Sequence, residues 1–137
     1  MSTTSARKRL RFDRAEITEE AGGQCRVDVR LALGQLLFQA DSADTADGNG
    51  PLRAAAAATL KALQEAAANK FTCSLSDLDH VNALGKDLIA VLVDVEFQGR
   101  VNQVFGSCQI AGSEIDCAVK AALNATNRMF ELAMRGE

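Results

Sequence analysis

The sequence contains no tryptophan, no tyrosine, one proline and one histidine in 137 residues. It also lacks any apolar run approaching the roughly 20 residues that a membrane-spanning helix requires, which excludes a helical membrane protein. Apolar residues make up 47% of the chain and charged residues 24%, as in ordinary folded domains. A chain of this length has room for one hydrophobic core. We therefore expect a single domain that does not cross a membrane.

The side chains that catalysis needs are scarce. The only imidazole, His80, lies near the end of an expected strand, where a surface or structural role is more common than general-base catalysis. No phosphate-binding loop and no nucleophile elbow occurs. The aspartates Asp41, Asp44 and Asp47 lack the later glutamate of an EF-hand loop, so a solvated loop is the simpler interpretation. We expect no catalytic residues, no enzymatic activity and no cofactor.

The cysteines are scattered along the chain, with no Cys-x-x-Cys pair. They are Cys25, Cys73, Cys108 and Cys117. With one histidine beside them they do not show the spacing of zinc ligands, so we expect no metal site. Reduced thiols in a reducing compartment are the favoured interpretation, with disulfides as the alternative.

Positive charge gathers at the start of the chain. Residues 1–14 hold five basic residues and one acid, although the net charge of the chain is −3. They contain no apolar stretch of the kind found in a secretory signal, so we expect a cytoplasmic protein. We expect residues 1–8 to form a disordered basic arm. An arm that binds nucleic acid is the alternative, although no aromatic residues alternate with its charges.

The rest of the chain repeats one order of elements. Strands are expected at residues 10–17, 25–33 and 36–40, then a loop at 41–50 and a helix at 51–68. Strands at 71–81, 87–97 and 100–110 and a helix from Ser113 follow. In residues 25–33 apolar side chains alternate with polar ones, and apolar residues stand 64 positions later at each of these places (Val27, Val29, Leu31 and Leu33 with Val91, Val93, Val95 and Phe97). We infer a duplication: an α+β fold with repeats at 9–68 and 69–137, whose antiparallel sheets are layered against helices.

The first expected helix has small side chains around almost its whole circumference, including the alanine run at 54–58. A helix that is apolar all round is expected between two layers. A partner chain could supply the second layer, which predicts a homodimer with Ala54, Ala55 and Ala58 at its interface. High helix propensity alone is the competing explanation for the run.

Residues 113–128, Ser-Glu-Ile-Asp-Cys-Ala-Val-Lys-Ala-Ala-Leu-Asn-Ala-Thr-Asn-Arg, resemble the last helix of the C-terminal allosteric (dimerisation) domain of 2-isopropylmalate and citramalate synthases. Residues 47–52, Asp-Gly-Asn-Gly-Pro-Leu, resemble the turn that opens that domain's first helix. The resemblance implies paired βββα repeats that dimerise, and a small-molecule effector pocket near the helix-opening turns. The chain has no catalytic barrel, which implies action in trans. Residues 82–85 depart from the family's turn, which puts leucine binding in doubt.

The two helix-opening turns are the best ligand candidates. A helix start exposes unpaired N–H groups at the positive end of its dipole, while the carboxylates nearby suit an ammonium group. We expect an amino-acid or keto-acid effector to contact the residues of these turns (Asp47, Gly48, Asn49, Gly50, Ser113 and Glu114). Three functions remain open: a dimerisation module that binds a protein partner, a ligand-binding regulator, and a nucleic-acid-binding protein.

Overall fold

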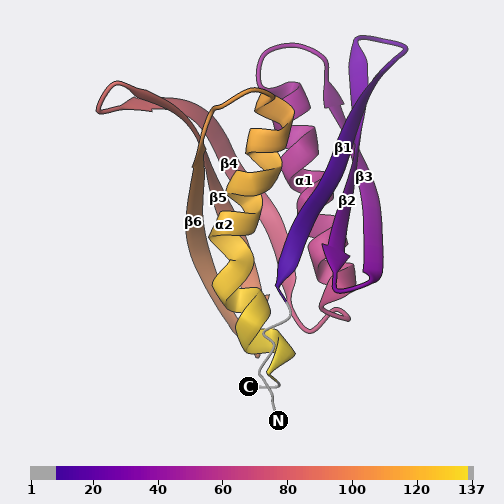
Figure 1. Cartoon of the computed structure of the whole chain (residues 1–137), viewed down its shortest axis with the longest axis vertical. Coiled ribbons are helices and arrows are strands. Elements are labelled where there is room, and N and C mark those ends of the chain that lie inside the picture. The colour runs from indigo at the N-terminus through magenta and orange to yellow at the C-terminus, as the bar shows by residue number, and fades with distance from the viewer. Residues whose placement is uncertain (1–8, 136–137) are drawn as a thin grey trace.

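The computed structural model describes residues 9–135 and contains two successive βββα units (Figure 1). The elements are β1 (Leu10–Glu20), β2 (Gln24–Leu33), β3 (Leu36–Thr45), α1 (Gly50–Ala66), β4 (Thr72–Ala83), β5 (Lys86–Phe97), β6 (Arg100–Gln109) and α2 (Glu114–Met134). They form two three-stranded antiparallel sheets, ordered β1-β2-β3 and β4-β5-β6. The predicted α+β fold and its repeated unit are confirmed. The expected arm, residues 1–8, lies outside the described residues.

The two helices lie side by side between the two sheets and begin at the same end of the molecule (Figure 1). Helix α1 contacts β2, β3, β4 and α2, and α2 contacts β5, β6 and α1. The prediction that α1 is enclosed by layers is therefore confirmed. Both layers, however, belong to the same chain.

This arrangement corrects the expected dimer interface. Ala54, Ala55 and Ala58 are at most 1% exposed within a single chain, because α1 packs on its own sheet and on α2. Alanine is suited to that position, since its short side chain lets backbones approach closely from several directions. These residues belong to the core of the chain, and a surface for a second copy must be sought elsewhere.

The core is built from the inward-facing positions of the middle strands. Val27, Val29 and Leu31 on β2 are fully buried, and so are Val93 and Val95 on β5. Because side chains alternate between the faces of a strand, the 64-residue spacing places corresponding residues of the two repeats against the helices.

Several boundaries differ from the expected ones; β1 continues to Glu20 and β4 to Ala83. Strand β3 continues to Thr45, which pairs with Gln24, whereas a loop was expected from residue 41. The aspartates here are tolerated because they project from the sheet, and Asp41 forms an ion pair with Arg26 at 3.2 Å. Helix α1 ends at Ala66, two residues early, because the backbone turns left-handed at residues 68 and 69.

One close approach fixes α2 against its sheet. A Cβ atom at Gly106 on β6 would lie 2.4 Å from the backbone nitrogen of Ala125 and 2.5 Å from the carbonyl oxygen of Ala121. Only glycine leaves room for the helix at this distance. Within the described chain, neither helix combines the length and apolarity needed to span a bilayer.

Candidate functional site

The turn that opens α1 is held by its own backbone. Gly48 adopts a positive φ of 57°, and a Cβ atom at Gly50 would lie 1.9 Å from the carbonyl oxygen of Thr45. The amide of Gly50 donates to the carbonyl of Asp47 at 3.0 Å. Asn49 occupies the N-cap position, but its side chain makes no capping hydrogen bond. Both glycines of this turn therefore have a structural reason to be glycine.

The turn that opens α2 is capped as expected. The Ser113 hydroxyl accepts a hydrogen bond from the amide of Asp116 at 3.2 Å, and Glu114 and Asp116 place negative charge in the first turn. Both features stabilise a helix start. Ser113 thus already satisfies one of the N–H groups that an anionic ligand would use.

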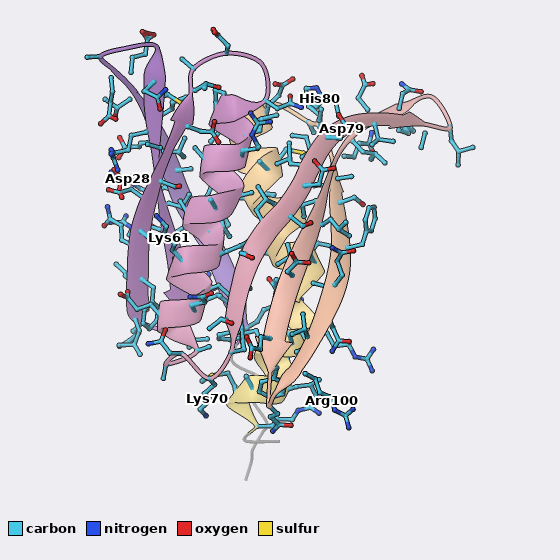
Figure 2. The ribbon with its side chains drawn as sticks, turned by 180° about the vertical axis from the view of Figure 1, so that it is seen from behind. Asp28, Lys61, Lys70, Asp79, His80 and Arg100 are labelled. Carbon is cyan, nitrogen blue, oxygen red and sulfur yellow. The ribbon has the colours of Figure 1, made fainter. Side chains whose placement is uncertain are left out.

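The two predicted turns lie at the same end of the molecule, because α1 and α2 start there (Figure 1). A pocket of about 330 Å³ lies beside the second turn and is lined by His80, Val81, Asn82, Asp87, Leu88, Ile110 and Glu114. Of the six predicted ligand-binding residues, only Glu114 lines it. Figure 2 shows His80 near the end of β4, at the same end of the molecule as the helix starts.

The polar groups of this pocket come from three elements. His80 Nε2 on β4 lies 3.7 Å from Glu114 Oε2 on α2. The Asn82 amide donates to Asp87 Oδ1 at 2.9 Å, and the Asp87 carbonyl accepts from the Ile110 amide at 2.9 Å. Two carboxylates beside an imidazole favour a small molecule that carries an ammonium group over a simple anion.

Sequence patterns alone did not find this pocket, because His80 and Asp87 reach Glu114 only through the pairing of β4 with β5. His80 lies opposite Ile89, so its side chain is on the helix-facing side of the sheet. Its position near a strand end was the only signal in the sequence. Among residues 9–135, no three His, Cys, Asp or Glu side chains are placed to hold a metal ion.

Three of the four thiols are poorly suited to nucleophilic chemistry. Burial raises the pKa of the Cys73 thiol from its ordinary 9.0 to about 12. Burial and a hydrogen bond with Cys108 raise the pKa of Cys117 to about 12 as well, and burial raises the pKa of Cys25. A thiol that stays protonated at neutral pH is a weak nucleophile.

The outward-facing surfaces of the two sheets differ in chemistry. On the first sheet most of the charged side chains are paired: Arg26 contacts Glu20 at 2.9 Å and Asp41 at 3.2 Å, and Arg30 contacts Asp13 at 2.6 Å. Asp28 projects from this side (Figure 2) and accepts from Gln39. The exposed apolar residue on this face is Leu37, beside the β2–β3 turn. This face is typical of one that is in contact with water.

The outward face of the second sheet, which we call the second-sheet surface, combines apolar residues with acids. Strand register places on it Val81, Leu88, Ala90, Leu92, Val101 and Phe105 together with Asp77, Asp79, Asp94 and Glu96. Val101 is 72% exposed and Phe105 is 65% exposed. Within residues 9–135 these acids form no ion pairs. A hollow of about 180 Å³ lies beside Phe105.

No protein-family model matches the chain, and no curated protein matches it either.

Proposed function

We propose that this protein is a non-catalytic dimerisation module that forms a homodimer through the β6 border of the second-sheet surface and can also present a bound small molecule to a partner. The observation that carries the proposal is the contrast between the two sheets. They arise from equivalent parts of the two repeats, yet one is covered with ion pairs and the other exposes Val101, Phe105 and their apolar neighbours. Exposed apolar groups gathered on one face mark interaction surfaces.

The duplication sharpens this contrast. If both outward faces were in water, their side chains would be expected to have similar polarity, because the sheets occupy equivalent positions around the helices. Exposed apolar side chains at Val101 and Phe105 on β6 give no advantage on a solvated face. They do stabilise a contact that removes them from water.

The test compares two exposed apolar positions. Phe105→Ser removes an apolar side chain from the second-sheet surface, whereas Leu37→Ser makes the matching change on the first sheet, where Leu37 is 56% exposed. We expect Phe105→Ser to weaken self-association at least tenfold in size-exclusion chromatography and Leu37→Ser to leave it unchanged. Equal behaviour of both variants and the wild type would remove the second-sheet surface from the proposal.

A second function is favoured by the pocket at the start of α2. Its volume, its two carboxylates and its histidine suit a molecule of amino-acid size with an ammonium group. A regulatory effector at a helix start is also what the resemblance to the synthase allosteric domains implies. A keto acid lacks the ammonium group and suits Asp87 and Glu114 less well. Binding nucleic acid through the arm depends on residues outside the described part of the chain.

Thermal melting tests this second function. A ligand that binds only the folded state at ~100 times its Kd adds roughly 2.7 kcal/mol of stability. Branched-chain amino acids, keto acids and phosphate are the probes. We expect an amino acid to raise the melting temperature, Glu114→Gln to abolish the shift, and Asp47→Ala at the other helix start to preserve it. A shift that survives Glu114→Gln unchanged would place the ligand elsewhere.

A further inference from the structure

Strand β6 is an edge strand without the charges that protect such edges. The two sheets of the described chain end in β1, β3, β4 and β6. Strand β1 carries charges of both signs, and β3 and β4 each carry two aspartates. Beyond Arg100, the remaining nine residues of β6 are Val-Asn-Gln-Val-Phe-Gly-Ser-Cys-Gln, with no charge and no proline. Edge strands usually carry charged residues or proline, because their unpaired backbone groups would otherwise pair with another strand.

The free backbone groups of β6 can be assigned from its turn. Gln98 and Gly99 have φ values of 54° and 77° and form a two-residue turn between the paired residues Phe97 and Arg100. The two residues that flank such a turn donate to and accept from each other. Along the strand, residues bonded to the neighbouring strand then alternate with residues whose backbone groups point away from it. The backbone groups of Val101, Gln103, Phe105 and Ser107 therefore point away from β5.

Helix α2 closes one end of this edge. The Ser107 amide donates to Asn124 Oδ1 at 3.1 Å, which agrees with the assigned direction and leaves no free N–H at Ser107. The open segment thus runs from Val101 to Phe105 and is centred on Gln103. Figure 1 shows β6 at the outer border of its sheet, with β5 on its other side.

We propose that β6 pairs antiparallel with β6 of a second copy, with the two-fold axis at Gln103, so that the two second sheets join into one six-stranded sheet. This rests on the proposed dimerisation and names its edge and register. Val101 of each copy then lies opposite Phe105 of the other, and Gln103 lies opposite its own counterpart. The two most exposed apolar side chains of the open segment, Val101 and Phe105, therefore contact each other at two symmetry-related places.

The same residues determine the pairing register and the identity of the partner strand. Centring the axis on Phe105 instead would require hydrogen bonds from Ser107, whose amide is already bound to Asn124. Pairing around Gln103 brings no like charges opposite each other, since residues 101–105 are uncharged. The Gln103 amide group is held by Asp94 Oδ1 at 2.8 Å, so it lies along the sheet rather than across the edge. The segment is complementary to itself, which favours a second copy over an unrelated strand.

The test changes the backbone and leaves the apolar side chains in place. Gln103→Pro removes one outward N–H from the centre of the segment, and Gln109→Pro makes the same change on β6 outside it. An outward-facing proline is tolerated on an edge strand. We expect Gln103→Pro to raise the dimer dissociation constant at least tenfold and Gln109→Pro to leave it near that of the wild type.

Crosslinking gives a second readout that does not depend on a proline variant folding. Directly opposite residues of a hydrogen-bonded antiparallel pair have Cα atoms about 5.5 Å apart, within disulfide reach. Gln103→Cys is therefore expected to crosslink two copies under mild oxidation, well above the wild type and Gln109→Cys. A wild-type monomer would overturn both the dimerisation and this pairing. A dimer that Gln103→Pro does not weaken and Gln103→Cys does not crosslink would overturn the pairing alone.

Discussion

At the scale of single residues, glycines set the closest contacts of the fold. Gly106 allows the backbone of α2 to lie directly on β6, and it also keeps the inward side of the proposed pairing strand flat. No apolar or polar pattern in the sequence marks this residue as different from the glycines of turns. The contact arises between residues far apart in the chain, so only the fold reveals it.

We predict that Gly106→Ala lowers the free energy of unfolding by about 1–3 kcal/mol, because the new methyl group must push α2 from the sheet. Urea unfolding measures this. Gln109→Ala, on the exposed end of the same strand, serves as the control and should change stability by less than about 0.5 kcal/mol. Equal stability of Gly106→Ala and the wild type would show that the helix can shift at no cost.

The buried thiols predict a dependence of stability on alkaline pH. Cys73 and Cys117 have pKa values raised from 9.0 to about 12, so between these values the folded chain keeps protons that the unfolded chain loses. Stability is then fully present below about pH 9 and is lost as the pH rises towards about 12. Denaturant unfolding across this range should show a shallower decline for the Cys73→Ala, Cys117→Ala double variant. Identical slopes would mean that other groups cause the decline.

The candidate site was only partly predictable from residues. Ser113 was expected at the start of α2, and its capping hydrogen bond is there, because capping depends on neighbours within one turn. The partners of Glu114 were not predictable. His80 stands 34 positions earlier in the chain and reaches the helix start only when the sheet folds over it.

At the scale of elements, the spacing of apolar residues predicted the strands and helices well where one face of the element is buried. Burial alternates along most of β2 and β5 because one face of each strand meets the helices. It fails in the second half of β3, where small and acidic residues project from an edge and resemble a loop. Pairing with β2 extends that strand to Thr45, and such pairing is not visible in the residues of β3 alone.

We predict that Ala56→Glu on α1 destabilises the fold by on the order of 3 kcal/mol or more, because a charge would enter a fully enclosed position without a partner. Ala56 is 0% exposed. Lys61→Glu, at an exposed position of the same helix (Figure 2), replaces a cation that donates to the Asp41 carbonyl and should cost far less. Thermal melts of the two variants make the comparison. Similar melting temperatures would show that α1 is not enclosed.

At the scale of the whole molecule, two repeats have formed one core and left two unlike surfaces. Each repeat supplies one sheet and one helix, and neither could bury its helix without the other. The alanine-rich helix is the seam of this assembly, which is why it suggested an interface in the sequence. The alanine-rich interface lies between the two repeats of the same chain. The contact that we propose between two chains lies instead at the edge of β6, on the border of the second-sheet surface.

Sedimentation equilibrium of the wild-type chain over a range of micromolar concentrations tests the proposed dimerisation most directly. The exposed Val101 and Phe105 and the unprotected edge of β6 predict a reversible species of twice the chain mass of 14.5 kDa, with the single chain appearing on dilution. A single species of 14.5 kDa at every concentration would contradict the proposal.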